Sequence, residues 1–260
     1  MATNYEKYIH GKQHLVSNCG QDERGRYHGG TAGDQSGREY YLREWYNKGW
    51  TCILRYPDPV ARMLMCHMAI DAALNPKIGY DQDNRKSFWE ELKAKRFDPA
   101  RITNKCEADC TSSTTAIAKG VGYLKELHPL AEVSINTTSR DMRRNFVKAG
   151  FIVFTDSKYL TTPKYLLPGD VLLKENHHAC INVSKGELSP SLDGENKVII
   201  TGKSVWVREG PSTSYEQIAV VHYGDMFPYL NERYADGSGW YKVNFQGHEG
   251  FVSCKYSKLI

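Results

Sequence analysis

The stretch CEADCTSSTTAIAKGVGYL, residues 106–124, decides the fold because it predicts a helix with a cysteine at its start. Apolar residues recur at helical spacing through its second half, and Asp109 precedes them as a capable N-cap. The pattern predicts a helix over 111–124 with Cys110 in its first turn. A thiol there faces unpaired backbone N–H groups and the positive end of the helix dipole, which favours the thiolate. Cys110 is therefore a candidate nucleophile; the alternative is a cysteine that only fills space.

A thiolate nucleophile needs a base, usually a histidine, within hydrogen-bonding reach. The segment HHACINVS, residues 177–184, reads as a strand that opens with two histidines just after a turn. Residues alternate between the two faces of a strand. His178 therefore shares the more polar face with Cys180 and Asn182. His177 lies on the opposite face, so only one of the two histidines can face a given nucleophile.

The seven cysteines do not predict a disulfide framework, because their number is odd and no short spacing repeats. Most of them are expected to be small buried hydrophobic residues. Cys106 and Cys110, taken with the two histidines, offer a superficial set of four zinc ligands. Adjacent histidines on a strand point to opposite faces, however, and cannot easily share one ion. The sequence therefore predicts neither a metal nor an organic cofactor.

Further helical and strand patterns surround these two segments. The expected elements cover residues 38–46, 51–56, 59–74, 111–124, 139–149, 151–155, 166–174 and 177–184. The helix over 139–149 is expected to end at Gly150 as its C-cap, and 151–155 reads as a buried strand. Because helices come first and strands later, the pattern predicts the α+β class.

The clearest boundary is SKGELSPSLDGEN, residues 184–196, a polar stretch with one proline and two glycines that reads as a linker. Beyond it, residues 197–260 alternate apolar and polar residues in short bursts bounded by turn residues, which predicts a small all-β barrel. The expected organisation is a domain over 1–183, the linker, and a second domain over 197–260. Residues 1–75 are expected to complete the sheet of the first domain.

Composition excludes several classes of protein. The chain has 260 residues, 40% of them hydrophobic, which is enough for one large domain or two modest ones. The net charge of +4 is too small and too scattered to predict nucleic-acid binding. No apolar run approaches the roughly 18 residues that a membrane span needs. The first residues lack the apolar core of a signal peptide, so we expect synthesis and retention in the cytosol.

Residues 78–184 resemble the NlpC-type papain-like cell-wall amidohydrolases, especially their phage branch. IGYDQDNR (78–85) resembles the family's Gly-Tyr-Ser-Gln segment, and DCTSS (109–113) resembles its Asp-Cys-Ser-Ser nucleophile motif. LLPGDVLLKENHHACINV (166–183) resembles the Pro-Gly-Asp strand and the following Gly-His-x-Ala strand. The order and spacing of the three motifs also match. The resemblance implies a papain-like domain in which a helix-borne cysteine packs on a small antiparallel sheet.

The same resemblance implies roles for individual residues. Cys110 takes the position of the nucleophile and His178 that of the general base. Tyr80 matches a tyrosine that lines the substrate cleft, and Asp109 is expected to cap the helix beside that cleft. His177 stands where the family has glycine, which leaves the choice of base between the two histidines open and places His177 at the cleft as well.

A third polar residue, which orients the base, normally lies on the strand after the histidine strand. Here the chain enters the linker at Ser184, so that strand is missing. The segment GDQSGREYYLREWY, residues 33–46, is predicted to add a strand or loop beside the histidine strand. It would supply Asp34, Gln35 or Glu39 as the orienting group. The alternative is an ordinary surface turn.

Residues 197–260 resemble bacterial Src-homology-3-type wall-binding modules along nearly their whole length. VWVREGPSTSYEQIAVVHYGD (205–225) matches the opening of such modules, and GWYKVNFQGHEGFVSCKYSKLI (239–260) matches their closing strands. The resemblance implies binding to the cell wall. The aromatic residues able to stack on a glycan or peptide are Tyr215, Trp240 and Tyr241, although Trp240 fits the core of a barrel equally well.

Together the two resemblances imply a phage-type endolysin. We expect it to wait in the host cytoplasm until a separate membrane lesion releases it, and then to act as a monomer on Gram-positive peptidoglycan. The expected reaction is cleavage of the γ-D-glutamyl–diamino-acid bond of the stem peptide by an endopeptidase. The alternatives are an N-acetylmuramoyl-L-alanine amidase and a catalytically inactive wall-binding protein.

Overall fold

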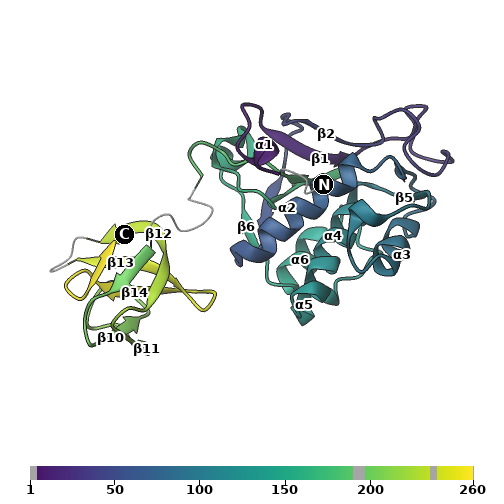
Figure 1. Cartoon of the computed structure of the whole chain (residues 1–260). Coiled ribbons are helices and arrows are strands. Elements are labelled where there is room, and N and C mark those ends of the chain that lie inside the picture. Colours follow the sequence, from purple (N-terminus) through teal and green to yellow (C-terminus); the bar gives the residue numbers. More distant parts are fainter. Residues whose placement is uncertain (1–4, 190–196, 235–238, 260) are drawn as a thin grey trace. The chain divides into compact units, whose positions relative to one another are not determined.

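The structure is a computed structural model that describes residues 5–189, 197–234 and 239–259 (Figure 1). The chain divides into two compact units, Met1–Ser189 and Pro190–Ile260. Of the predicted linker, residues 190–196 lie outside the described residues. The residues before them belong to the first unit: the Ser184 hydroxyl donates to the Tyr8 carbonyl over 2.7 Å and accepts from the Leu15 N–H over 2.9 Å.

The first unit is built on a six-stranded antiparallel sheet in the order β2-β1-β8-β7-β3-β6. Its strands are β1 (Leu15–Cys19), β2 (Tyr40–Glu44), β3 (Cys52–Arg55), β6 (Ile152–Phe154), β7 (Val171–Lys174) and β8 (His178–Asn182). The first three come from residues 1–75 and the last three from the end of the unit. The two sets are interleaved, because β1 pairs with β8 and β3 pairs with both β7 and β6.

Helices cover this sheet, and the two longest, α2 and α4, contact each other and the strands β1 and β8 (Figure 1). The helices are α1 (Glu6–Ile9), α2 (Pro59–Leu74), α3 (Ser87–Ala94), α4 (Cys110–Leu124), α5 (His128–Ala131), α6 (Met142–Lys148) and α7 (Ser157–Leu160), with 3-10 turns at Pro99–Arg101 and Pro163–Tyr165. A short parallel pair, β4 (Ile78–Tyr80) and β5 (Cys106–Ala108), leads the chain into α4. None of the helices in the described ranges is both long and apolar enough for a membrane span.

The α+β class predicted from the sequence is confirmed, with differences in detail. Helix α2 (Pro59–Leu74) covers the predicted range 59–74, and its start is fixed because the Asp58 carboxylate accepts from the N–H groups of Val60 and Ala61. Helix α6 (Met142–Lys148) is shorter than the predicted 139–149, and Gly150 follows its end with a φ of +100°, which favours glycine. The prediction of a buried strand over 151–155 is wrong. Ile152 is 49% exposed because β6 is the last strand at the edge of the sheet.

The second unit is all-β in its described residues, as predicted. Its strands are β9 (Lys197–Ile200), β10 (Ser204–Arg208), β11 (Gln217–His222), β12 (Met226–Tyr234), β13 (Trp240–Phe245), β14 (His248–Ser253) and β15 (Ser257–Leu259). They form one sheet in the order β11-β10-β14-β13-β12-β9-β15. Its core consists of Val198, Ile200, Val205, Val207, Val221, Val243, Phe245 and Val252. Alternation along each strand brings these side chains to the inner face.

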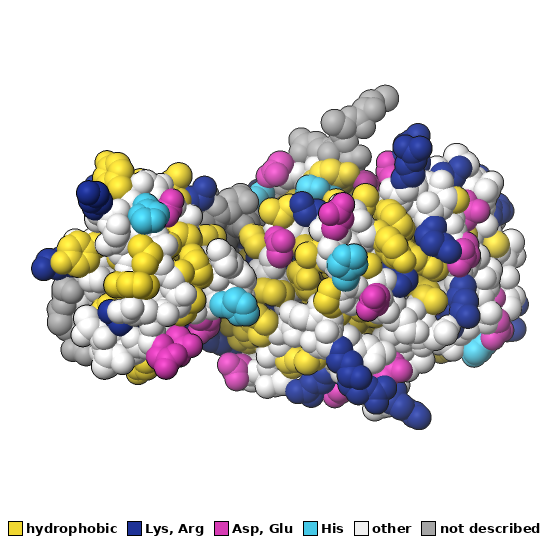
Figure 2. All heavy atoms as spheres, turned by 90° about the horizontal axis from the view of Figure 1, so that it is seen from below, with side chains coloured by type: hydrophobic (Ala, Val, Ile, Leu, Met, Phe, Trp, Pro, Cys, Tyr) yellow, Lys and Arg dark blue, Asp and Glu magenta, His cyan; other side chains and the backbone are white. Residues whose placement is uncertain are grey.

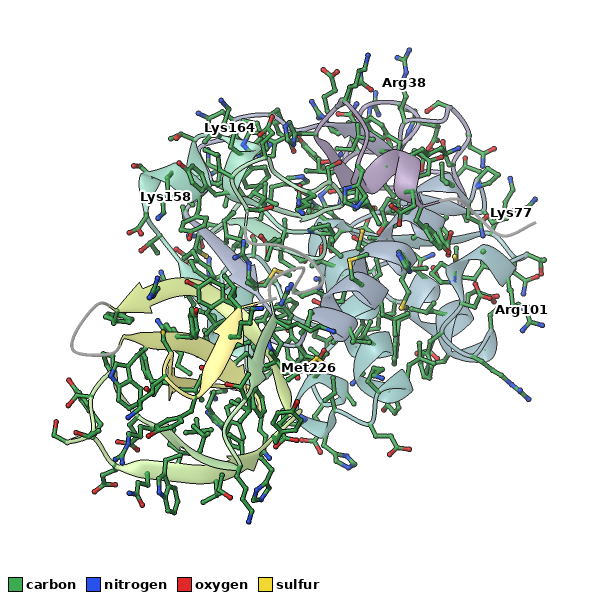
Figure 3. The ribbon with its side chains drawn as sticks, turned by 60° about the vertical axis from the view of Figure 1, so that its left-hand side comes forward. Arg38, Lys77, Arg101, Lys158, Lys164 and Met226 are labelled. Carbon is green, nitrogen blue, oxygen red and sulfur yellow. The ribbon has the colours of Figure 1, made fainter. Side chains whose placement is uncertain are left out.

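Charged side chains are spread over the surface. Figure 2 shows one face on which acidic and basic side chains are interspersed. Figure 3 shows Arg38, Lys77 and Arg101 extending outward from the first unit, and all three are exposed. This mixed surface fits the scattered charge expected from the sequence.

Candidate active site

Cys110 is the first residue of α4, at a tight junction between strand β5 and the helix. Asp109 is the N-cap: its Oδ1 accepts from the N–H groups of Thr111, at 2.9 Å, and Ser112, at 2.6 Å. The Ser112 hydroxyl in return accepts from the Asp109 N–H at 2.9 Å, which completes a capping box. The cap predicted from the sequence therefore exists, and it fixes the position of the cysteine.

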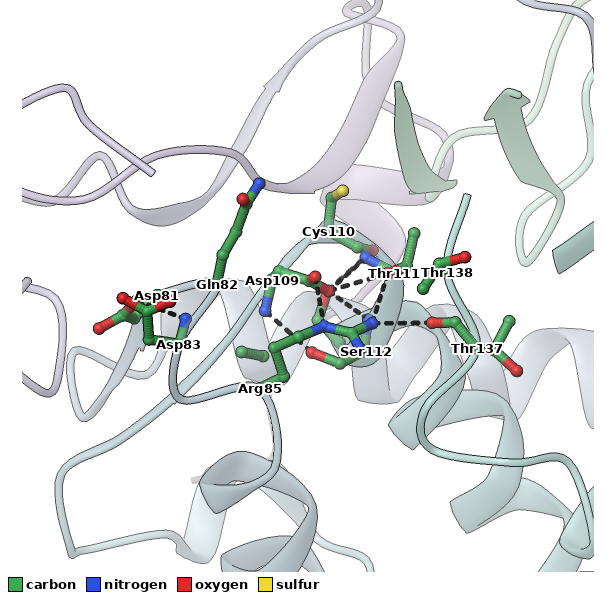
Figure 4. Close-up of polar contacts among 12 residues, drawn as sticks. Asp81, Gln82, Asp83, Arg85, Asp109, Cys110, Thr111, Ser112, Thr137 and Thr138 are labelled. Atoms are coloured by element: carbon green, nitrogen blue, oxygen red, sulfur yellow. Dashed lines mark hydrogen bonds and ion pairs between the residues drawn. The ribbon is translucent and has the colours of Figure 1, made fainter. Parts of the chain in front are cut away.

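Arg85, a residue that sequence reasoning missed, holds the other side of this cap (Figure 4). Its Nε donates to Asp109 Oδ2 at 2.6 Å. Its second nitrogen donates to the Thr111 hydroxyl at 3.0 Å and to the Thr137 carbonyl at 2.8 Å. Figure 4 shows the Cys110 sulfur pointing away from this network. Arg85 therefore fixes the start of α4 without occupying the space in front of the thiol.

The structure turns His178 inward and leaves its neighbour His177 exposed. His178 Nε2 lies 2.9 Å from Oδ1 of Asn18, which is on the adjacent strand β1. An amide oxygen only accepts hydrogen bonds, so Nε2 carries the proton and Nδ1 is free to act as a base. Oδ1 of Asn18 also accepts from the Tyr46 hydroxyl at 3.1 Å. Asn18 therefore selects the tautomer of the buried histidine.

The candidate nucleophile and the candidate base lie at one place. Cys110 and His178 both line the same cleft. The N–H of Ala179, the residue after the histidine, donates toward the Cys110 sulfur, as does the N–H of Thr111. Sequence elements about 70 residues apart are thus brought together by the packing of α4 against β8.

Burial controls the charge state of this pair. It raises the pKa of the Cys110 thiol to about 12, and the neighbouring Asp109 charge acts in the same direction. Burial lowers the pKa of His178 to about 3, aided by the charges of Lys48 and Arg43. Both shifts favour the neutral forms of the thiol and the imidazole. Burial of the thiol therefore opposes the effect of the helix start, which favours the thiolate.

The cleft in front of the pair has a volume of about 420 Å³ and a polar lining. Four tyrosines, three cationic side chains and several amides surround it, and none of its lining residues is Asp or Glu. The lining consists of Asn18, Gly20, Gln21, Tyr27, Arg38, Tyr41, Arg43, Tyr46, Lys48, Tyr80, Gln82, Cys110, Asn176, His177 and His178. The volume falls within the usual range for a ligand site, roughly 300–1,000 Å³.

Two of the residues predicted to contact substrate do line this cleft. Tyr80 is 1% exposed and its hydroxyl accepts from Gln82 Nε2 at 3.0 Å. His177 lies at the exposed rim. Asp109 does not line the cleft; its carboxylate is engaged with the helix start and with Arg85.

The predicted orienting residues do not contact the histidine. Asp34 accepts from the N–H groups of a local turn, and the Gln35 side chain donates to the carbonyls of Ala32 and Gly33. Glu39 is buried and its Oε2 accepts from the Tyr80 N–H at 2.9 Å. This part of the sequence-based hypothesis is wrong.

The strand beside the histidine strand is β1, and the 33–46 segment contributes β2, one position further out. The signal that could have revealed β1 is the short alternation LVSNC at 15–19, in which Val16 and Asn18 share a face. The residues around this segment are mostly polar, so the alternation is hard to recognise in the sequence.

In the second unit, two of the three predicted stacking residues belong to the packed structure. Trp240 is 7% exposed and so is unavailable to stack on a ligand, which corrects that prediction. Tyr241 is half-buried with its ring edge-on to Tyr229, 5.6 Å between centroids. Tyr215 is 49% exposed and stays a prediction.

The zinc set rejected from the sequence has no counterpart in the described ranges. The one potential metal-ligand group found there is His28, Asp81 and Asp83, with ligand atoms within 4.8 Å of one another. His28 and Asp83 are exposed and already pair with each other at 3.0 Å.

All residues that line the candidate site fall within one match to a protein-family model. Residues 16–189 match the model of the endolysin-like domain family, and residues 203–258 match that of the bacterial SH3 domain. No curated protein matches the chain significantly. The first match begins in β1 and contains Asn18, Cys110 and His178. It covers more than half of the chain, which therefore belongs to the endolysin-like domain family and carries a C-terminal bacterial SH3 domain.

Proposed function

We propose that this protein is a peptidoglycan hydrolase that cleaves an amide bond of the stem peptide with Cys110 as nucleophile, His178 as base and Asn18 as orienting residue. The observation that carries the proposal is the common cleft: a cysteine at a helix start, a buried histidine and the amide that fixes its tautomer. The endolysin-like and SH3 matches support a hydrolase of the cell wall. The complete set of side chains favours an enzyme over an inactive wall-binding protein.

The first half of the reaction forms a thioester. The Cys110 sulfur attacks the amide carbonyl carbon while its proton passes to Nδ1 of His178. Because burial favours the neutral form of both groups, we propose that proton transfer accompanies the attack rather than preceding it. The N–H of Cys110 lies in the first helical turn, where the helix itself provides no acceptor, and it is placed to stabilise the oxyanion. The C–N bond then breaks, and the leaving amine takes the proton from His178.

The second half of the reaction releases the acyl group. Water attacks the thioester carbonyl while His178 takes one proton from it. The C–S bond breaks, the proton returns to the Cys110 sulfur, and a carboxylic acid leaves. Throughout both halves Asn18 keeps Nε2 of the imidazole hydrogen-bonded, which stabilises the imidazolium each time it forms.

The proposed bond is the γ-D-glutamyl–diamino-acid bond, cut by an NlpC-like endopeptidase. The polar, cationic cleft supports a stem peptide rich in carboxylates. We propose further that the enzyme acts as a monomer on Gram-positive walls after release from the host cytoplasm. The SH3 domain supports attachment to the wall, with Tyr215 as the exposed aromatic contact.

The proposal is tested by mass spectrometry of fragments released from purified Gram-positive peptidoglycan. We expect wild type to release fragments with new D-glutamate ends and Cys110→Ala to release none. Cys254→Ala, which changes a cysteine of the second unit, is the matched control and should behave like wild type. New muramic-acid ends would identify an amidase instead. Pelleting with the walls without any fragment would leave a binding protein and refute the catalytic assignment.

A further inference from the structure

The lining of the cleft carries charge of one sign. Its ionisable side chains, apart from tyrosines, the thiol and the two histidines, are Arg38, Arg43 and Lys48. This differs from the mixed charges on the face of the molecule shown in Figure 2. Within the described ranges, no carboxylate forms an ion pair with any of the three. The cations are therefore available to a ligand, and the cleft concentrates a positive potential.

Arg43 is the best fixed of the three. It lies on β2, and its guanidinium carbon is 3.9 Å from the centroid of the Tyr46 ring. The hydroxyl of the same tyrosine donates to Asn18, so one ring joins the cation to the group that orients His178. Stacking on Tyr46 restricts the rotamers of Arg43 and leaves its planar donor edge free. That edge has the geometry for two parallel hydrogen bonds to a carboxylate.

Lys48 is a second cation near the Tyr46 ring. Its ammonium is 5.9 Å from the centroid of the Tyr46 ring. The Lys48 carbonyl accepts from Lys174 Nζ at 2.9 Å, which anchors its backbone to β7. Lys48 and Arg43 line the same cleft as His178, and their charges, after burial, help to lower its pKa. Arg38 instead extends outward at the rim (Figure 3).

The position of these cations limits the ligand they suit. Arg43 and Lys48 line the same cleft as Cys110, so a substrate whose scissile carbonyl faces Cys110 can present a nearby anionic group to them. In a γ-linked D-glutamate the α-carboxylate meets this condition, because the same residue supplies the scissile carbonyl. Walls in which this carboxylate is amidated lack the charge. Teichoic-acid phosphates also carry negative charge, but they are not attached to the scissile residue.

We propose that Arg43 and Lys48 form a subsite for the carboxylate of the residue that supplies the scissile carbonyl, so that the enzyme selects free-acid stem peptides over amidated ones. This inference rests on the proposed function and adds the determinant of its specificity. Arg38 contributes long-range attraction at the rim, which salt screens.

The test compares two synthetic peptides, L-Ala–γ-D-Glu–L-Lys–D-Ala and its α-amide. We expect wild type to cleave the acid with a kcat/KM roughly tenfold or more above that of the amide, as for loss of a charge-assisted hydrogen bond. In the double variant Arg43→Gln/Lys48→Gln the ratio should fall close to one, through loss of activity on the acid. Arg101→Gln, which removes an exposed cation outside the cleft, should keep the wild-type ratio.

Equal kcat/KM for the two peptides in wild type would overturn the subsite, as would a wild-type ratio in the double variant. Failure to cleave either peptide would instead count against the proposed function. In that case calorimetry with Cys110→Ala tests the subsite separately from the activity. Binding of the acid at least about tenfold more tightly than the amide would support the subsite, and a smaller difference would refute it. Inhibition of wild type, but not of the double variant, by polyglycerol phosphate with no acid preference would assign the cations to phosphate and overturn the carboxylate assignment.

Discussion

The two units of this protein differ in what they bury. The core of the second unit is aliphatic and aromatic, and its buried polar residues among those described are two serines, Ser253 and Ser257. The first unit buries ionisable groups as well, including Glu39, Asp170 and His178. Each of these has a specific hydrogen-bond partner from a distant part of the chain. The comparison teaches that the second unit is specified by apolar alternation, whereas the first unit depends on particular long-range polar contacts.

The largest expected effect separates the two adjacent histidines. His178→Ala removes the buried base and should lower kcat by roughly 10²–10⁴-fold, the usual contribution of general acid–base catalysis. His177→Ala changes an exposed residue at the rim and should leave kcat near wild type. The measurement is the initial rate of amine release from purified walls, with thermal melts to show that both variants fold. The reverse order of the two rates would assign the base to His177.

The next effect concerns the stability of the first unit. Asp170 accepts from Arg55 through two hydrogen bonds, at 2.7 and 2.6 Å, and both side chains are buried. Asp170→Ala leaves a buried cation without its partner and should lower the free energy of unfolding by about 3–5 kcal/mol. Val243→Ala removes two methyl groups from the core of the second unit.

Scanning calorimetry of the full chain distinguishes the two variants. We expect Asp170→Ala to lower the melting temperature of one transition and Val243→Ala to lower that of the other, because each residue lies within a separate compact unit. A shift of both transitions by either variant would show that the units do not unfold independently.

A smaller effect tests the orienting amide. Asn18→Ala should lower kcat by roughly tenfold to a hundredfold, with a smaller change in KM, because His178 loses the partner of Nε2. Asn18→Asp keeps an acceptor and adds a negative charge that raises the pKa of His178. Its pH–rate profile should therefore shift to higher pH while part of the rate is kept. An Asn18→Ala variant with the full wild-type rate would exclude this residue from the site.

The sequence predicts local features of this site well and its long-range partners poorly. Helix α4, its Asp109 cap and the strand that carries His178 follow from periodicity and capping, which depend on near neighbours. Asn18 and Arg85 act through contacts across 160 and 24 residues of chain. Hydrophobic periodicity does not indicate such distant contacts. Strand β1 has only five residues, so its own pattern in the sequence is also weak.

Alternation also fails to distinguish aromatic residues that line the inside of the barrel from those outside. Trp240 and Tyr215 both stand near strand-like sequence, yet the first is buried and the second exposed. Trp240 begins β13, whose register against its neighbours sets the face of the side chain, whereas Tyr215 lies between β10 and β11, outside any strand.

The smallest expected effect is a pH dependence of stability. Burial raises the pKa of Glu39 to about 7 from its ordinary value of 4.5. Between these two values the folded chain binds a proton that the unfolded chain has lost. The contribution of Glu39 to the free energy of unfolding is therefore greatest below pH 4.5 and decreases as the pH rises to 7.

Glu39→Gln should remove this component, so that the melting temperature falls less from pH 5 to pH 7 than it does in wild type. Asp34→Asn, at a carboxylate of a surface turn, is the control. Equal slopes in all three proteins would refute a raised pKa at Glu39.

The central claim is that Cys110 forms a covalent acyl intermediate during cleavage of the wall. The most direct measurement is acid quenching of the enzyme during turnover on purified peptidoglycan, followed by mass spectrometry of its cysteine-containing peptides. We predict an added acyl mass on the peptide that contains Cys110, together with no release of fragments by Cys110→Ala. Release of fragments by Cys110→Ala at the wild-type rate, with every cysteine peptide at its unmodified mass, would contradict the account.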